Sequence, residues 1–307
     1  MSNSREKKIC TVILEFQNSK MTLATIASLK KAVVPEGFTN LIVVVDNSPV
    51  PDELLAKKLK TDKSIKLITT LQNTGFAKGN NIGIRYGIKR GCQYFLLLNN
   101  DVLVQKNFLS QLIKTACAEA AIAVPKIYFA KGYEFHKNRY QANELGKVIW
   151  FGGAIFDWNN VYVKHLGMDE VDIGQYNQSQ SIDFANFCCV LIPKQVFKKI
   201  GLLDEKYFLY WEDGDFSIRA KQAGFKIIYQ PKAVIWHKNS GSSGSGSTLH
   251  DYYLTRNRLI FGLKYARPRT KFALIRESLF KLITGRPGEK KGIIDYYLHR
   301  FGKGKFL

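Results

Sequence analysis

Short apolar runs alternate with amphipathic stretches along the first hundred residues of this 307-residue chain. The runs predict strands at Ile9–Phe16, Leu41–Val45, Ile65–Thr69 and Tyr94–Leu98. Helical spacing follows Asn18, Pro51 and Gly75. Alternation of this pitch is typical of an α/β fold, with a mostly parallel sheet between helices. Such sheets bind ligands beyond the carboxyl ends of their strands, so functional side chains are expected there.

The pattern loosens between about residue 125 and residue 180, where turn residues at Gly152–Gly153 and Trp158–Asn160 predict hairpins and loops. Regular elements return after this stretch. They are an apolar run at Phe184–Ile192, a short helix to Ile200, a helix from Trp211 that Gly224 stops, and strands near Ile227–Tyr229 and Val234–His237.

The last part of the chain has a different composition. A Gly/Ser run predicts a flexible loop over residues 241–248. Residues 249–307 then hold 14 Lys and Arg against four acidic residues, with aromatic and aliphatic side chains interleaved. This predicts basic amphipathic helices, which would lie on an anionic membrane surface or pack on the preceding core with their cations in water.

The whole chain is basic, with a net charge of +21 and a pI of about 9.7. Such a charge favours an anionic partner, namely a phosphate, a nucleic acid or an acidic membrane. No apolar run reaches the ~20 residues that a bilayer span needs. The five cysteines lack C-x-x-C spacing and mostly lie in apolar segments, as in a reducing compartment. We therefore expect a cytoplasmic protein that is neither secreted nor membrane-spanning.

Polar clusters follow three of the predicted strands. Asp46 ends the second strand, Asn73–Asn81 follow the third, and Asn99–Asp101 end the fourth. Asp101 would suit a divalent cation bound with a substrate diphosphate, but an Asp after a strand is also a common turn former. Asp46 would accept a hydrogen bond from a nucleobase imide N–H, or would close the turn before Pro49.

Three glycines, Gly75, Gly79 and Gly83, recur after the third predicted strand. They would let the backbone approach a ligand, with Lys78 near a phosphate, or they would pack a helix closely on the sheet. Their spacing matches neither the dinucleotide-binding G-x-G-x-x-G nor a P-loop. The sequence therefore gives little support to a dinucleotide-dependent or Walker-type enzyme.

Three carboxylates, Glu212, Asp213 and Asp215, lie within four residues at the start of a predicted helix. They repel one another unless a cation or the helix N-terminus offsets their charge. Asp215 and Arg219 are spaced i, i+4 and can pair, which leaves Asp213 as the candidate general base. His237 ends an apolar strand and is a candidate ligand of a metal or phosphate, or a structural histidine.

Together these residues resemble the family 2 glycosyltransferases, inverting enzymes of the GT-A fold, and most closely their rhamnosyltransferase-like members. The resemblance lies in an ordered set of motifs: Val43–Ser48, Asn73–Asn81, Leu97–Val102, Gly201–Glu205, Phe208–Asp215 and His237. It implies a GT-A domain over residues 1–240, with a nucleotide-binding half (about 1–124) and an acceptor-binding half (about 125–240). The basic helical region 249–307 would follow it.

The resemblance also implies a role for each matching residue. Asp213 would be the catalytic base, supported by Glu212 and Asp215. Trp211 would contact the acceptor. Asp101, the last carboxylate of a DxD-type motif, and His237 would hold a divalent cation, Mg²⁺ or Mn²⁺. The nucleotide sugar would contact Phe16, Asp46, Asn73, Gly75, Phe76, Lys78, Asn80 and Asn99.

Two positions depart from the family's pattern. The metal motif reads Asn99-Asn100-Asp101, so a single carboxylate remains. This implies metal assistance rather than tight metal binding. The first strand ends Glu15-Phe16-Gln17, where relatives often carry Tyr-Asn.

The reaction that the resemblance implies is a single displacement. A sugar would pass from a nucleotide diphosphate to an acceptor hydroxyl with inversion of the anomeric centre. The segment Gly152–Trp158 resembles one in rhamnosyltransferases, so dTDP-rhamnose is the first expected donor and a UDP-hexose the second. The expected acceptor is a lipid-linked glycan at the inner face of a bacterial membrane, in cell-surface polysaccharide synthesis. Asp213 and Asp101 would then face each other across one cleft.

Two other classes of protein would use part of this pattern. A sugar-phosphate nucleotidyltransferase needs a glycine-rich basic loop after the first strand, and Gln17–Lys20 lacks glycine. A non-catalytic nucleic-acid-binding protein would account for the positive charge. It leaves the carboxylates at 212, 213 and 215 unexplained, because they repel a phosphate backbone. No nucleic-acid partner is therefore expected.

Overall fold

The predicted α/β fold is present in the computed structural model, which describes residues 6–239 and 246–304. The first strands are β1 (Lys7–Glu15), β2 (Phe38–Asp46), β3 (Ile65–Thr69) and β4 (Tyr94–Asn99). The helices between them are α1 (Ser19–Leu29), α2 (Glu53–Lys60) and α3 (Gly75–Lys89). All these predicted elements are confirmed. Asn18 and Asp52 start α1 and α2 because their side chains accept N-capping hydrogen bonds from Met21 and Leu55.

Shorter strands and further helices follow β4. The strands are β5 (Val102–Val104), β6 (Ile122–Phe129), β7 (Ile149–Phe151), β8 (Ala154–Asp157), β9 (Tyr162–His165), β10 (Gln180–Ser181), β11 (Cys189–Pro193) and β12 (Ile227–His237). The helices are α4 (Phe108–Glu119), the 3-10 turn η1 (Lys137–Arg139), α5 (Lys194–Ile200) and α6 (Glu212–Gln222). The hairpin predicted around Trp158–Asn160 is confirmed as β8–β9.

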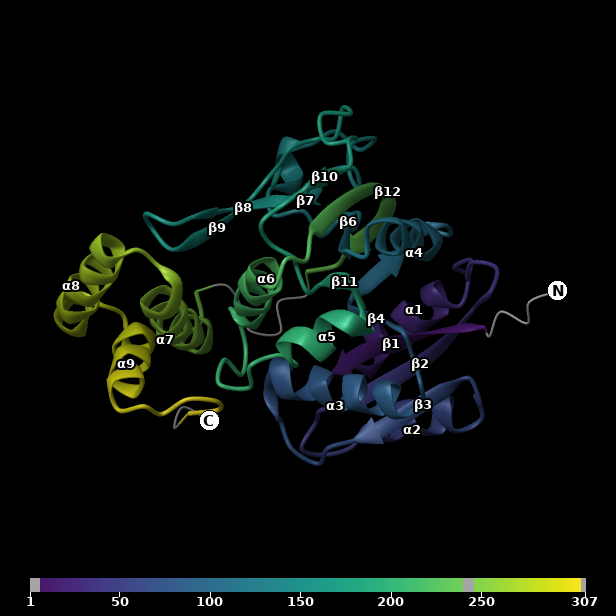
Figure 1. The fold of residues 1–307 in the computed structure, drawn as a ribbon, viewed down its shortest axis with the longest axis horizontal. Helices are drawn as coiled ribbons and strands as arrows, with labels where there is room; N and C mark the ends of the chain where they lie inside the picture. Colours follow the sequence, from purple (N-terminus) through teal and green to yellow (C-terminus); the bar gives the residue numbers. More distant parts are fainter. Residues whose placement is uncertain (1–5, 240–245, 305–307) are drawn as a thin grey trace.

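A ten-stranded sheet in the order β10-β12-β6-β11-β4-β1-β2-β3 forms the centre of the described chain, with β5 beside β12 and β7 beside β6 (Figure 1). β3, β2, β1, β4, β6 and β12 run parallel, and β11 runs antiparallel between β4 and β6. The strand order reverses at β1, which lies between β2 and β4. Ligands of open α/β sheets bind at such a point.

One prediction about the strands was wrong. Ile227–Tyr229 and Val234–His237 belong to a single strand, β12, which pairs with β6 on both sides of an irregularity between Gln230 and Val234. Pro231 lies within this irregularity. Proline has no N–H to donate to the ladder, so it interrupts the pattern without ending the strand.

Helix α3 packs very close to β1 because glycines face the strand. A Cβ on Gly79 would lie 2.4 Å from Leu14, and one on Gly83 would lie 2.4 Å from Val12. Residues four apart share one face of a helix. Of the two interpretations of Gly79 and Gly83, the structure supports helix packing.

Helices α7 (Thr248–Tyr265), α8 (Pro268–Thr284) and α9 (Pro287–Tyr297) gather at one end of the molecule, beyond α6 and near the β8–β9 hairpin (Figure 1). The basic C-terminal region is therefore helical, as predicted. It also has a packed interior, since Tyr252, Tyr253 and Phe261 are fully buried. Of the predicted loop at 241–248, residues 241–245 lie outside the described residues.

Two simpler expectations concern the membrane and the thiols. Within residues 6–239 and 246–304, every helix is too short or too polar to cross a bilayer. Cys10, Cys92, Cys188 and Cys189 are buried free thiols, as expected, and Cys117 is exposed.

Candidate active site

Asp46 closes the turn that follows β2. Its carboxylate oxygens accept hydrogen bonds from the backbone N–H groups of Ser48 (3.0 Å) and Asp52 (3.2 Å). The turn-forming interpretation is therefore correct. The side chain is almost fully buried, and its contact with a nucleobase stays a prediction.

The loop before α3 is tied to the segment that leads to α6. Asn73 Oδ1 accepts a hydrogen bond from the N–H of Gly75 (2.9 Å), and the N–H of Phe76 donates to the Phe208 carbonyl (2.6 Å). Gly75 has a φ of +82°, and a Cβ there would lie 2.4 Å from the Phe208 ring. Glycine is needed here for its backbone conformation and for the close contact.

The other residues that are predicted to contact the nucleotide sugar differ in their exposure to solvent. Asn80 is buried and its Nδ2 donates to the Phe76 carbonyl (3.0 Å), so it stabilises the first turns of α3. Lys78 is exposed, and Phe16 and Asn99 are partly exposed at the ends of β1 and β4. Phe16, Lys78 and Asn99 are therefore accessible to a ligand.

The two departures from the family's pattern meet in one network. Glu15 is buried at the end of β1, and its carboxylate accepts hydrogen bonds from Asn100 Nδ2 (3.0 Å) and from the Thr22 hydroxyl. Asn100 therefore links the end of β1 to the turn after β4. This link gives the amide in the middle of the Asn-Asn-Asp motif a structural role.

Strand pairing brings Asp101 and His237 together. In the antiparallel ladder of β5 and β12, His237 lies opposite Val102, the neighbour of Asp101. His237 Nε2 is 3.1 Å from Asp101 Oδ1, and both side chains are largely buried. The Trp150 ring packs edge-on against the His237 ring, with centroids 4.7 Å apart.

Asp101 and His237 fit a divalent cation that also binds a diphosphate. A carboxylate oxygen and an imidazole nitrogen both coordinate Mn²⁺, and Mg²⁺ takes one or two carboxylates together with substrate phosphates. Within residues 6–239 and 246–304, no three His, Cys, Asp or Glu side chains converge as a metal site. The two buried, adjacent side chains therefore suit an ion that is bound jointly with the substrate.

The segment before α6 has an uncommon backbone conformation. Phe208, Tyr210 and Trp211 have φ angles of +60°, +67° and +75°. Non-glycine residues rarely adopt such angles. Strain of this kind persists only where the surrounding structure holds the backbone in place.

Two side chains of α7 hold this segment. Arg256 and Asn257 are both fully buried. Asn257 Nδ2 lies 2.7 to 2.8 Å from the carbonyl oxygens of Tyr207, Leu209 and Tyr210. The Arg256 guanidinium also donates to the Tyr207 carbonyl (3.3 Å). The C-terminal helices therefore help to fix the start of α6.

Asp213 lies in the first turn of α6 and is partly exposed. Burial raises the pKa of its carboxyl to about 7, although the backbone N–H groups of Gly214 and Phe187 donate to it. A carboxyl with this pKa takes up and releases protons at neutral pH, as a general base must. The pKa of Glu212 is raised well above its usual value by burial and by the charge of Asp213.

Asp215 has a different role from Asp213. Its fully buried carboxylate pairs with Arg219 (2.6 Å) and Lys264 (2.8 Å) and accepts a hydrogen bond from the Tyr265 hydroxyl (2.7 Å). Burial alone would raise the pKa of Asp215, but these partners lower it. The predicted pairing with Arg219 is confirmed, and Asp215 also joins α6 to α7.

A short segment before β11, Phe187–Cys188, lies close to both candidate centres. The N–H of Phe187 donates to Asp213. The pKa of the adjacent Cys188 thiol is raised by burial and by the charge of Asp101. Neighbouring Cα atoms are only 3.8 Å apart, so Asp213 and Asp101 approach the same piece of chain. This agrees with the predicted common cleft, which stays a prediction.

A cavity of about 570 Å³ opens beside Asp213. Its wall includes Trp211 and Glu212, the β8–β9 hairpin with Tyr162, and side chains of α7, α8 and α9. Small-molecule sites have volumes of roughly 300 to 1,000 Å³. Trp211, predicted to contact the acceptor, lines this cavity.

Four residues around the site were missed from the sequence. Trp150 packs against both His237 and His165. Burial lowers the pKa of His165 to about 4, so this ring is neutral. Nothing in the local pattern marks either residue. Arg256 and Asn257 lie in a helix full of cations, and the one available signal was that Arg256 has no acidic residue three or four positions away.

Comparisons with known proteins agree with this architecture. The family described as glycosyl transferase family 2 matches residues 11–201. The dTDP-rhamnosyl transferase RfbF of Shigella flexneri is 26% identical over 260 residues, which are 79% of this chain and 76% of that protein. The low-salt glycan biosynthesis hexosyltransferase Agl10 of Haloferax volcanii is 26% identical over 187 residues, 60% of this chain and 54% of that protein.

A solved structure is also similar. The crystal structure of GalNAc-T7 with UDP, GalNAc and Mn²⁺ aligns with a TM-score of 0.66 at 16% identity. The alignment covers 97% of this chain and 55% of the GalNAc-T7 chain, so this chain spans about half of that longer protein. The likeness confirms the predicted GT-A fold.

Proposed function

We propose that this enzyme, which belongs to glycosyl transferase family 2, moves rhamnose from dTDP-rhamnose to a glycan hydroxyl. The transfer inverts the anomeric centre. The name of the Shigella relative, which aligns over 79% of this chain, supports this donor. A UDP-hexose is the second candidate, supported by the Haloferax hexosyltransferase. The proposed acceptor is a lipid-linked glycan.

The observation that carries the proposal is the state of Asp213. Its carboxyl has a pKa of about 7 because the surrounding protein shields it from much of the solvent, and it lies in the wall of a cavity large enough for a sugar. In its charged form Asp213 takes the proton of the acceptor hydroxyl while that oxygen attacks the anomeric carbon. A single attack from the face opposite the diphosphate inverts the anomeric centre.

The leaving diphosphate needs positive charge. Asp101 and His237 would hold Mg²⁺ or Mn²⁺, which would supply that charge as the bond to the diphosphate breaks. Lys78 is exposed near the same strand ends and would bind a phosphate oxygen. The backbone of Asn73–Phe76, fixed by its hydrogen bonds to Phe208, would line the nucleotide.

A donor panel tests this function. The protein is incubated with dTDP-rhamnose and with UDP-glucose, UDP-galactose and UDP-N-acetylglucosamine, with MnCl₂, MgCl₂ or EDTA. Released dTDP or UDP is measured, and NMR of the product gives the anomeric configuration. We expect release from dTDP-rhamnose with a metal and its loss in EDTA. No release from any donor, together with no thermal stabilisation by dTDP or UDP, would contradict the proposal.

We also propose that α8 and α9 rest on an anionic membrane surface while they bind the acceptor. The apolar residues Phe272, Leu279, Phe280 and Ile283 of α8 are exposed. The same helix carries the exposed cations Arg269 and Arg276, and α9 carries the exposed Lys291. Interfacial helices combine an apolar face with Lys and Arg in this way.

Vesicle sedimentation tests the membrane contact. We expect binding to vesicles that contain phosphatidylglycerol and little binding to pure phosphatidylcholine. Ile283→Glu should weaken that binding, because Ile283 is 78% exposed on α8. Ile173→Glu is the matched control, since Ile173 is 87% exposed in a loop away from these helices. Equal binding of both variants and the wild type would contradict the contact.

A further inference from the structure

The cavity beside Asp213 has no excess of cations, although the protein as a whole is basic. Five carboxylates line it, and they are Glu212, Asp213, Asp251, Glu277 and Glu289. The cations in its wall are Arg258, Lys281 and Arg286. Because each of these cations is paired with a carboxylate, the cavity offers no unpaired lining cation in the described part of the chain to a phosphate or another anion.

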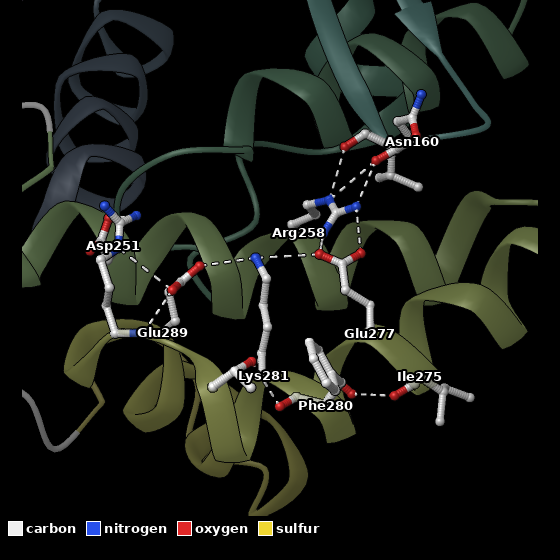
Figure 2. A network of polar contacts seen from close by, with 12 residues as sticks. Asn160, Asp251, Arg258, Ile275, Glu277, Phe280, Lys281 and Glu289 are labelled. Carbon is white, nitrogen blue, oxygen red and sulfur yellow. Dashed lines mark hydrogen bonds and ion pairs between the residues drawn. The ribbon is translucent and has the colours of Figure 1, made fainter.

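The cations are held by the carboxylates in one continuous network, which we call the ion-pair ladder (Figure 2). Its order along α7, α8 and α9 is Arg258, Glu277, Lys281, Glu289, Arg286 and Asp251. Arg258 contacts both Glu277 oxygens, at 2.9 and 3.0 Å. Lys281 lies 3.3 Å from Glu277 and 2.9 Å from Glu289. The ladder presents fixed donors and acceptors in alternation.

The ladder also reaches the β8–β9 hairpin. Arg258 donates to the carbonyl groups of Asn160 (2.8 Å) and Val161 (3.3 Å), which lie in the turn of the hairpin (Figure 2). The hairpin carries Tyr162 into the cavity wall, which Trp211 at the start of α6 also lines. The cavity is therefore bounded by paired charges as well as by aromatic side chains, namely Tyr162, Phe184, Tyr210 and Trp211.

Two buried polar atoms of the cavity wall make no hydrogen bond among the described residues, Oε2 of Glu212 and Nδ1 of His250. Oε2 of Glu212 makes no hydrogen bond, and Glu212 is only 4% exposed. Burial and the charge of Asp213 favour the protonated form of this carboxyl, which has an O–H to donate. A buried polar group normally has a hydrogen-bond partner, so this atom points to a ligand.

We infer that this cavity is the acceptor subsite for an uncharged saccharide unit, bound by the ion-pair ladder and Glu212 and packed against Trp211 and Tyr162. Sugar hydroxyls donate and accept hydrogen bonds at once, so they match alternating carboxylates and guanidinium groups. The inference rests on the proposed function and deepens it. The sugar of the acceptor, and not its phosphate or lipid part, lies between the hairpin and α7–α9.

Filling the cavity tests the inference. Binding of the methyl glycosides of glucose, galactose and N-acetylglucosamine is measured by saturation-transfer NMR, and binding of dTDP and UDP by thermal shift. Thr255→Trp adds a large ring in the cavity wall. Thr248→Trp adds the same ring at an exposed position of the same helix, outside the cavity. We expect Thr255→Trp to abolish glycoside binding and to leave nucleotide binding unchanged. Thr248→Trp should match the wild type in both assays.

A conservative variant covers the case in which Thr255→Trp does not fold. Glu277→Gln keeps the shape of the ladder and should weaken the bound glycoside roughly tenfold, as for loss of one hydrogen bond to a charged group. Glu119→Gln removes the same charge from an exposed ion pair with Lys226 and is the control. Glycoside binding that is unchanged in both cavity variants, or displaced by pyrophosphate, would overturn the inference. Absence of any nucleotide shift in the wild type would contradict the proposed function alone.

Discussion

The ends of β1 and β2 and the first turn of α6 both bury carboxylates, but they surround them differently. Glu15 and Asp46 accept hydrogen bonds from nearby amides and hydroxyls. Among the residues that the structure describes, Oε2 of Glu212 has no hydrogen-bond partner, and loss of solvation raises the pKa of Asp213 to about 7. A buried charge without compensation is unfavourable. The strand ends therefore form a stable frame, whereas the start of α6 keeps a carboxyl ready for proton transfer.

Asp213→Asn should have the largest effect, because it changes the carboxyl at the start of α6 and leaves the hydrogen-bonded carboxylates at the strand ends intact. Turnover should fall roughly 100- to 10,000-fold, because the amide cannot accept the proton. The melting temperature at pH 8 should stay the same or rise, because the variant has no buried charge. A raised folded pKa makes the wild type lose stability as pH rises from 3.8 to about 7, so this gain should be clearly smaller at pH 5 than at pH 8. Measurements of dTDP release and of melting at both pH values check this prediction.

Near-normal turnover of Asp213→Asn would remove Asp213 from the role of base. Unchanged thermal stabilisation by dTDP serves as the control that the donor side is intact.

Asp215→Ala should mainly lower the free energy of unfolding, whereas Asp213→Asn mainly lowers turnover. Removal of one partner of a fully buried ion pair costs about 3–5 kcal/mol. The loss here should lie towards the lower end, because Lys264 is 46% exposed and Arg219 keeps its hydrogen bonds to the carbonyls of Ile200 and Leu202. The pKa of Asp215 is lower in the folded protein than in the unfolded chain. Its contribution to the free energy of unfolding is therefore full at pH values above the usual carboxyl pKa and is lost as the pH falls through the lowered pKa of the folded state. Urea unfolding at pH 7 and pH 3 measures this.

The matched control for Asp215→Ala is Asp183→Ala. Asp183 pairs with Lys221 of the same helix α6, but both side chains are about 40% exposed. Surface pairs contribute about 0–1 kcal/mol. Equal destabilisation by the two variants would contradict a special role of Asp215.

The sequence predicted those features that depend on near neighbours. The i, i+4 spacing identified the pair Asp215–Arg219, and the apolar runs identified β1 to β4. The features that the sequence did not predict depend on contacts between residues that are far apart in the chain. Asn257 contacts carbonyls 47 to 50 residues away, and no local pattern reveals that contact. The meeting of Asp101 with His237 depends on the register of β5 and β12, and it was expected only from the family resemblance.

Asn257→Ala tests whether the strained segment before Asp213 needs α7. The turnover number should fall roughly tenfold or more, because a small displacement of a catalytic group is costly to the rate. The affinity for dTDP should change little, since the Gly75–Phe208 contacts remain. Lys114→Ala, at an exposed position of α4, is the control. A fall in stability with an unchanged turnover number in the folded fraction would make Asn257 merely structural.

The smallest expected effect is the pH dependence of the wild-type rate. It directly measures whether the pKa of Asp213 differs from that of an ordinary carboxyl. Only the charged form of Asp213 accepts a proton, and its pKa is about 7. The rate at pH 6 should therefore be roughly a tenth of the rate at pH 8, with saturating donor and metal. The fall should continue tenfold per pH unit below pH 6. A rate that stays constant down to pH 5 would mean that the base has an ordinary carboxyl pKa, like a carboxylate in the hydrogen-bonded frame of the strand ends. The start of α6 would then lose its distinction as the place where burial prepares a carboxyl for proton transfer.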